Sequence, residues 1–143
     1  MPSSVWWRDL ERRLADAHVT LEAKLASDPE IPAALFDSFV DNAIDNASDK
    51  AVREPGIEIA VRFTCDEEKV ELAVCDTGSQ VEESAAAHLF REPIERGSGL
   101  GIGLYQAARQ AQQAGYRLDL ARNVAGDVRF SLAKSAKLAG GED

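Results

Sequence analysis

The sequence predicts an α+β fold, a two-layer α/β sandwich in which a mixed, mostly antiparallel sheet is covered by helices on one face. Two observations carry this prediction. Short apolar runs occur as two adjacent pairs, each joined by a polar turn, which is typical of antiparallel hairpins. Long segments with apolar residues at helical spacing separate these pairs, so helices can cover the sheet. A doubly wound parallel sheet would instead need a helix between successive strands.

The elements follow from local patterns along the chain. Residues 6–17 carry apolar side chains at helical spacing, and residues 19–25 alternate between apolar and polar as a half-buried strand does. Pro32 precedes the first long helix, Pro55 and Gly56 end it, and Gly115 ends the second long helix. We predict helices over 6–17, 33–51, 82–89 and 100–114, and strands over 19–25, 57–65, 70–76, 116–121 and 128–133.

The composition limits the class of protein. The net charge of -9 argues against binding to the nucleic-acid backbone, which requires clustered basic residues. No apolar run is long enough for a membrane span, and no signal peptide is visible. We expect a domain over 18–134 and a flexible tail over 135–143. The pair Trp6-Trp7 suggests that residues 1–17 are a helical remnant leading from a missing upstream domain.

The two cysteines do not fit a disulfide. If residues 57–65 and 70–76 form a tight hairpin, Cys75 lies opposite roughly residue 60, about 15 Å along the strand from Cys65. That separation is far beyond bridging distance. Two reduced, mostly buried thiols are therefore expected.

Two asparagines stand out in the predicted helix over 33–51. Asn46 falls within the apolar half of the helical wheel, and Asn42 lies at its edge one turn earlier, beside a stripe of four aspartates. An amide among apolar neighbours costs free energy unless its hydrogen bonds are met. Two amides that face one way suit Mg²⁺ already held by phosphates, since neutral oxygens can bind that ion. The alternatives are an asparagine bonded to backbone or water and an acidic stripe that is only a solvated face.

An acid and a series of glycines complete the pattern. Asp76 ends a predicted strand, where its carboxylate could accept a hydrogen bond from an exocyclic amine or could cap its own turn. Glycines alternate over 97–103 before and inside a predicted helix, and such a segment lets phosphates approach backbone N–H groups. The spacing matches neither the P-loop nor the dinucleotide fingerprint. A hinge, or close helix packing through Gly101 and Gly103, is the alternative.

These segments, in this order, resemble the GHKL (Bergerat-fold) ATP-binding proteins, and most of all the catalytic ATP-binding domain of bacterial sensor histidine kinases. The resemblance covers about residues 19–133. Residues 39–47 resemble the N-box, Asp76-Thr77-Gly78 the first glycine box, Leu89-Phe90 the F-box, residues 97–104 the second glycine box, and residues 126–132 the closing strand.

The resemblance implies a set of roles. Asn46 would hold Mg²⁺ on the triphosphate of ATP, with Asn42 beside it, and both would serve catalysis. Asn42 stands where the gyrase and heat-shock chaperone branches carry a catalytic Glu, which favours the kinase branch. Asp76 would read the adenine amine. The other expected nucleotide contacts are Gly78, Lys50, Phe90, Arg96, Gly97, Gly99, Leu100, Gly101 and Gly103.

A kinase of this type transfers the γ-phosphoryl group of ATP to a histidine on a separate dimerisation domain, and a response regulator is an indirect partner. Such a kinase domain is cytoplasmic, either in a cytoplasmic protein or as the cytoplasmic part of a membrane-anchored sensor. Neither His18 nor His88 lies in the acid-flanked helical setting expected of a phosphoacceptor.

Three departures from the family pattern leave alternatives open. Gln80 stands where the first glycine box usually has its second glycine, and Asp49 stands where many kinases have a basic or aromatic residue, so that Lys50 or Arg53 would reach phosphate instead. The segment between Phe90 and Gly97 is short. The alternatives are a stand-alone GHKL serine kinase of the anti-sigma type and a degenerate scaffold module that does not bind ATP.

Overall fold

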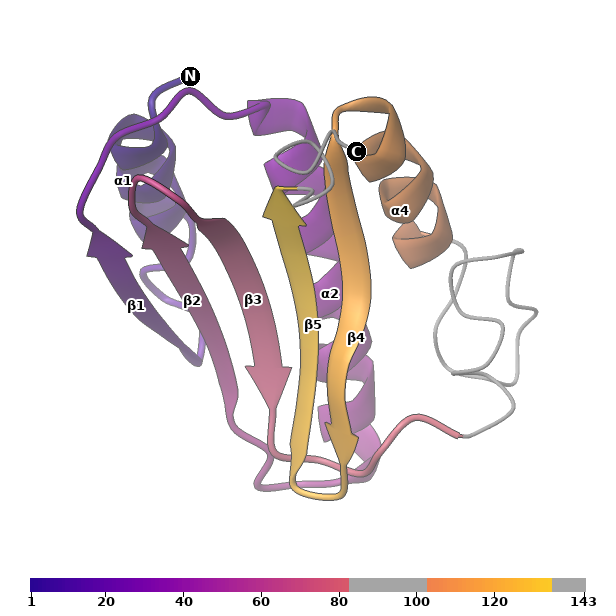
Figure 1. Cartoon of the computed structure of the whole chain (residues 1–143). Helices are drawn as coiled ribbons and strands as arrows, with labels where there is room; N and C mark the ends of the chain where they lie inside the picture. The colour runs from indigo at the N-terminus through magenta and orange to yellow at the C-terminus, as the bar shows by residue number, and fades with distance from the viewer. Residues whose placement is uncertain (83–102, 135–143) are drawn as a thin grey trace.

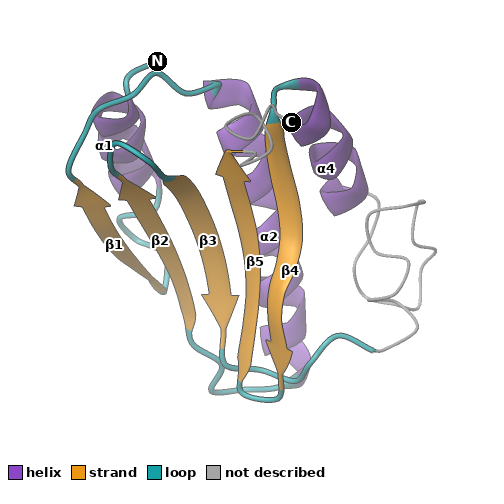
Figure 2. Cartoon of the chain, in the orientation of Figure 1, coloured by secondary structure: helices purple, strands orange, loops and turns teal. Residues whose placement is uncertain are grey.

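The computed structural model describes residues 1–82 and 103–134. A single five-stranded sheet in the order β1-β2-β3-β5-β4 forms one layer, and the helices form the other (Figures 1 and 2). In chain order the elements are α1 (Ser3–Arg13), β1 (Val19–Leu25), α2 (Ala33–Arg53), β2 (Ile59–Cys65), β3 (Val70–Asp76), α4 (Gly103–Gln113), β4 (Tyr116–Val124) and β5 (Asp127–Lys134). The predicted α+β sandwich is thus confirmed.

The sheet is mixed and mostly antiparallel, as predicted. Strand β1 pairs with β2 in parallel, and the other three pairings are antiparallel. A parallel pair needs a long crossover connection, and α2 provides it between β1 and β2. This crossover places α2 across the sheet, with its C-terminal end close to the end of β3 (Figure 1).

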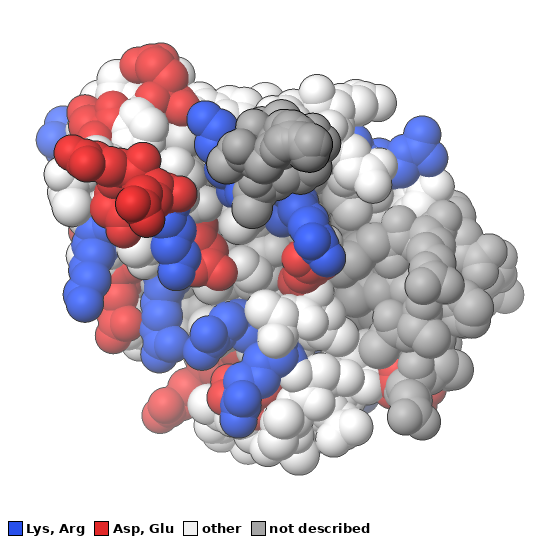
Figure 3. Space-filling model, viewed as in Figure 1, with Lys and Arg blue, Asp and Glu red and all other residues white. Residues whose placement is uncertain are grey.

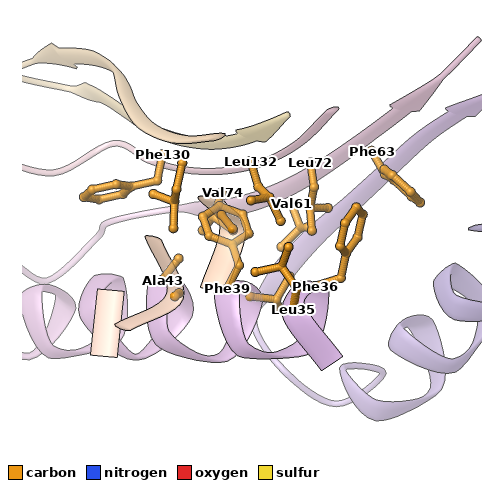
Figure 4. Packing of buried hydrophobic residues seen from close by; sticks show 14 of the residues in the cluster. Leu35, Phe36, Phe39, Ala43, Val61, Phe63, Leu72, Val74, Phe130 and Leu132 are labelled. Atoms are coloured by element: carbon orange, nitrogen blue, oxygen red, sulfur yellow. The ribbon is translucent and has the colours of Figure 1, made fainter. Parts of the chain in front are cut away.

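The core lies between α2 and the sheet. One face of α2 points at inward-facing side chains of the central strands (Figure 4). The labelled residues of this cluster are Leu35, Phe36, Phe39, Ala43, Val61, Phe63, Leu72, Val74, Phe130 and Leu132. Because strand side chains alternate between faces, this packing places Asp76 on the helix side of β3, two and four residues beyond Val74 and Leu72.

The N-terminal helix differs from the prediction in its bounds. It spans Ser3–Arg13 rather than 6–17. At its start, Asp28 from a distant segment accepts hydrogen bonds from the Ser4 backbone N–H at 2.7 Å and from the Ser4 hydroxyl. Trp6 and Trp7 are buried in the core of this domain. Their apolar surface is therefore covered within the chain, and an upstream domain stays a prediction.

The second hairpin is longer and tighter than predicted. Strands β4 and β5 run on to pair Val124 with Asp127, which leaves a two-residue turn in place of the predicted connection over 123–127. Gly126 adopts a φ of +87° in this turn, a left-handed conformation that glycine takes without strain. Helix α2 also runs two residues beyond its predicted end, to Arg53.

The remaining predicted segments have separate outcomes. Cys75 lies opposite Ala60 and Cys65 opposite Val70, which confirms the predicted register, and both thiols are buried and free. Burial raises the pKa of Cys65. The predicted helix over 100–114 is confirmed over Gly103–Gln113. The predicted helix over 82–89, the start of the 100–114 helix and the tail over 135–143 lie outside the described residues, apart from Glu82.

The open face of the sheet carries charges of both signs. In the space-filling view, basic and acidic side chains lie intermingled over the strands (Figure 3). Arg62 pairs with Glu22 at 3.1 Å, and Arg117 pairs with Asp119 at 3.0 Å. Within the described ranges, no helix combines the length and apolarity that crossing a bilayer requires.

Candidate nucleotide-binding site

A buried ion pair joins the end of β3 to the last turns of α2. The Lys50 ammonium lies 3.0 Å from Asp76 Oδ1 and 3.2 Å from Oδ2. The side chains are 9% and 5% exposed, respectively. Charges so far from water are tolerated when they are paired and hydrogen-bonded. The sequence predicted a binding role for each residue but did not predict their contact, which follows from the way α2 crosses β3.

The turn after Asp76 is held by the Asp76 carboxylate. The Gly78 N–H donates to Asp76 Oδ1 at 2.8 Å. Asp76 therefore caps its own turn, which is the second role considered for this carboxylate. Gly78 is buried, and a Cβ there would lie 2.5 Å from Ile57 Cδ1 and 2.6 Å from Lys50 Cδ. A larger residue at this position would therefore force the Ile57 and Lys50 side chains to shift.

Glu54, just beyond α2, also holds this turn. Its Oε1 accepts a hydrogen bond from the Ser79 N–H at 2.9 Å, and its Oε2 accepts one from the Ser79 hydroxyl. The hydrogen bonds from Ser79 lower the pKa of the Glu54 carboxyl. Gln80, the departure from the glycine-box pattern, lies exposed at the surface and leaves these contacts intact. No feature of the sequence singled out Glu54.

The β4–β5 hairpin anchors the same segment from the other side. The Asn123 side chain accepts a hydrogen bond from the Val81 N–H at 2.7 Å and donates one to the Val81 carbonyl at 3.0 Å. The Gly126 N–H donates to the Gly78 carbonyl at 2.8 Å. Asn123 was expected only as part of a connection, and its side chain instead fixes the course of the chain after Asp76.

The two asparagines of α2 lie at successive turns. Asn46 is buried at 8% exposure, and Asn42 is half-buried. The Asn42 Nδ2 donates to the Ser38 carbonyl at 2.8 Å, which turns its Oδ1 toward α4, where a Cβ on Gly103 would lie 1.8 Å from that oxygen. The missing side chain at Gly103 is therefore what lets the Asn42 amide sit against α4.

We expect Gly103→Ala to lower the free energy of unfolding by about 1–2 kcal/mol, because the new methyl group displaces the Asn42 amide. In an Asn42→Ala background the same change should be neutral or stabilising by up to about 1 kcal/mol, since alanine favours a helix over glycine. Urea unfolding of the four proteins measures both steps. Equal effects of Gly103→Ala in the two backgrounds would contradict the steric explanation.

Helix α2 separates the Asp76 end of the site from the Asn42 end. Lys50 is eight residues beyond Asn42, so the two lie about 12 Å apart along the helix axis. Asp76 marks one end of this line, and Asn42 with Gly103 marks the other. In this structure the Lys50 ammonium lies at the Asp76 end, and its predicted contact with phosphate stays a prediction. The predicted contacts Phe90, Arg96, Gly97, Gly99, Leu100 and Gly101 lie outside the described residues.

The donor atoms fit one kind of metal binding. Among the described residues, no group of three His, Cys, Asp or Glu side chains is arranged to hold a metal ion. The amide oxygens of Asn42 and Asn46 are neutral, hard ligands of the type that Mg²⁺ accepts when phosphates supply most of its shell. The site thus fits an ion that arrives with a phosphorylated ligand.

The aspartate stripe of α2 has a simpler explanation. Three of its members, Asp41, Asp45 and Asp49, are exposed, and Arg13 of α1 pairs with Asp37 at 2.9 Å and with Asp41 at 3.6 Å. The part of Asp41 that is covered by its neighbours is the largest cause of the raised pKa of its carboxyl group. The stripe is therefore the solvated face given as the alternative above.

Comparison with known families identifies a match over most of the chain. A sequence model of the family described as "Histidine kinase-, DNA gyrase B-, and HSP90-like ATPase" matches residues 28–137. This range includes α2, the end of β3, α4 and the β4–β5 hairpin. No curated protein sequence is similar enough to be matched.

Solved structures share the fold at low sequence identity. The catalytic domain of histidine kinase ThkA superimposes with a TM-score of 0.68 at 13% identity, over 94% of each chain. The mycobacterial sensor histidine kinase MprB gives 0.66 at 20% identity, over 94% of this chain and 95% of that one. The Acinetobacter baumannii histidine kinase AdeS gives 0.61 at 19% identity, over 92% of this chain and 61% of that one.

Proposed function

Because the chain belongs to the family of histidine kinase-, DNA gyrase B- and HSP90-like ATPases, we propose that it is the ATP-binding catalytic domain of a sensor histidine kinase. It binds ATP with Mg²⁺ and transfers the γ-phosphoryl group to a histidine on a separate dimerisation domain. A response regulator receives the group afterwards.

The observation that carries the proposal is the spacing of unlike groups along α2. A buried, fixed carboxylate paired with Lys50 lies at one end, and Asn42, whose amide oxygen faces Gly103 at the start of α4, is about 12 Å from Lys50 along the helix axis. A nucleotide needs this arrangement, because its base presents hydrogen-bonding edges and its phosphates need close backbone approach and a cation. The Asp76 carboxylate accepts from the adenine amine, and the phosphates lie toward Asn42 and Gly103.

Asn42 and Asn46 hold the Mg²⁺ of the bound nucleotide through their amide oxygens. Asn42 lies nearer to Gly103, where we place the phosphates. Its amide oxygen is therefore the better placed of the two to contact an ion bound to those phosphates. When bound, the ion neutralises charge on the triphosphate, which is a main demand of phosphoryl transfer. An amide cannot take a proton from water, so Asn42 supplies no general base for hydrolysis. This favours transfer to an external nucleophile such as histidine.

Calorimetric titration with ATP and Mg²⁺ tests the binding step. We expect micromolar to submillimolar affinity that falls at least about tenfold in Asp76→Asn, because the charged acceptor for the base amine is lost. Asn42→Ala and Asn46→Ala should weaken the dependence on Mg²⁺ and retain metal-free binding. Asp66→Asn, the same change in the exposed turn at the far end of β3, should bind as the unaltered protein does.

The outcomes separate the candidate functions. If the folded, unaltered protein binds no nucleotide, the scaffold alternative leads and the proposal fails. If it binds ATP and phosphorylates a partner, the chemistry of the product decides the branch. A phosphoryl group on histidine is lost in acid, whereas a phosphoserine survives acid and would favour the anti-sigma type of kinase.

A further inference from the structure

Lys50 lies at the base end of the site beside Asp76, a contact that residue type and spacing did not predict. We propose that Lys50 is a positioning residue for base recognition, which fixes the Asp76 carboxylate so that Oδ2 is offered to the exocyclic amine of a 6-aminopurine. This inference rests on the proposed function, because it assigns a role within the same nucleotide site. It goes beyond that function by naming what makes the site select an amine over an oxygen at this position of the base.

The hydrogen bonds of Lys50 all go to the end of β3 and the turn that follows it. The ammonium contacts both oxygens of Asp76, and it donates to the Ser79 carbonyl at 2.7 Å. An ammonium group has three N–H donors and no acceptor. These contacts hold the ammonium beside Asp76, about 12 Å along α2 from Asn42, where the proposed function places the phosphates, so its action on a nucleotide passes through Asp76.

The hydrogen bonds of Asp76 show which oxygen remains available. Oδ1 accepts from Lys50 and from the Gly78 N–H at 2.8 Å, which uses both of its lone-pair directions. Within the described residues, Oδ2 accepts only from Lys50, at 3.2 Å. One acceptor direction on Oδ2 therefore remains, and the carboxylate cannot rotate without breaking two hydrogen bonds on Oδ1.

The Lys50 side chain is itself held in place. Its Cδ lies directly under Gly78, so close that a Cβ on that residue would come within 2.6 Å. The turn that covers the side chain is fastened to Glu54 through Ser79 and to the β4–β5 hairpin through Gly78 and Val81. The ammonium cannot swing aside unless this turn moves, and Asp76 is consequently fixed from two directions.

Stability alone does not account for such a pair. The cost of removing two charges from water offsets much of their attraction, and apolar residues of similar volume would stabilise a core equally well. What an apolar pair cannot supply is an ionised oxygen with a fixed direction. A carboxylate that only accepts hydrogen bonds matches the amine of adenine and repels the carbonyl oxygen of a 6-oxopurine.

The test compares ATP with inosine triphosphate, in which an oxygen replaces the amine of the base. Calorimetric titrations of the unaltered protein should give an affinity for ATP at least about tenfold above that for inosine triphosphate, the effect of one charge-assisted hydrogen bond. In Lys50→Met this preference should fall to less than about threefold, through loss of ATP affinity with little change for inosine triphosphate. Lys69→Met, which removes an exposed lysine from a surface ion pair, should keep the full preference.

A second pair of variants keeps the test valid if Lys50→Met does not fold. Asp76→Asn and the double variant Lys50→Met with Asp76→Asn should bind ATP equally, because Lys50 acts through the carboxylate that both variants lack. A further loss in the double variant would mean that Lys50 contacts the nucleotide itself, which would overturn the proposal.

Other results have equally definite meanings. A folded Lys50→Met protein that keeps its preference for ATP would reduce Lys50 to a structural residue. Tighter ATP binding in this variant would mean that Lys50 obstructs Asp76, and it would also overturn the inference. In both cases the proposed function stands. If the unaltered protein binds neither nucleotide, the proposed function fails and the inference fails with it.

Discussion

Lys50→Met is expected to lower the free energy of unfolding by about 3–5 kcal/mol, because it leaves the Asp76 carboxylate buried without its cation. The methionine side chain has a similar length and fills similar space, so the effect isolates the charge. Adding Asp76→Asn should restore most of the loss, since a neutral amide in the same place has no charge to compensate.

Urea unfolding of the single and double variants measures this effect. Lys69→Met is the matched control, because Lys69 is exposed and its half-buried partner Glu71 keeps a hydrogen bond from the Ser131 hydroxyl, and pairs at the surface contribute about 1 kcal/mol or less. A loss below about 1 kcal/mol in Lys50→Met would show that water reaches the pair and that Asp76 is not confined as described.

Trp6→Ala is expected to lower the free energy of unfolding by about 3–5 kcal/mol, which is the usual effect of removing a large aromatic side chain from a core. Trp6 is 2% exposed and packs edge-to-face against Phe36 at 5.4 Å and Phe63 at 5.5 Å between ring centroids. Its indole N–H also donates to Asp37 at 2.8 Å, so α1 is fastened to both α2 and the sheet.

The same unfolding measurement on Val5→Ala serves as the control. Val5 lies next to Trp6 in α1 but is exposed, so its truncation should change the free energy of unfolding by less than about 0.5 kcal/mol. A small effect of Trp6→Ala would mean that the packing of α1 contributes little to the stability of the domain. That result would favour the expectation that residues 1–17 are a remnant of another domain.

The fold was largely predictable because its signals are local. The alternation of apolar and polar residues over 19–25 predicted β1, and the apolar run over 70–76 predicted β3, both with the bounds that the structure has. Two of the bounds that were wrong have causes that this pattern does not contain. The start of α1 depends on Asp28, which is far along the chain, and the length of β4 depends on a positive φ at Gly126. Hydrophobic periodicity cannot detect either cause.

The candidate site was only partly predictable, for a related reason. Residue type and spacing identified Asn42, Asn46 and Asp76 as groups that could serve a nucleotide. They did not reveal that Lys50 lies at Asp76, because that contact depends on the angle at which α2 crosses β3. Asn123 and Glu54 were missed because each acts on the backbone of a distant turn, and such a bond leaves no pattern in the sequence.

The β4–β5 turn has a practical consequence for labelling this protein. An exposed hairpin tip is ordinarily the safest place to insert a peptide tag or a fluorescent domain. Here the Gly126 N–H holds the Gly78 carbonyl beside Asp76, so an insertion at this tip would disturb the base end of the site. The β2–β3 turn over residues 66–69 lies at the other end of β3 from Asp76 and is the better position for a label. The first turn would suit a reporter meant to respond to the ligand, and the second a reporter meant to ignore it.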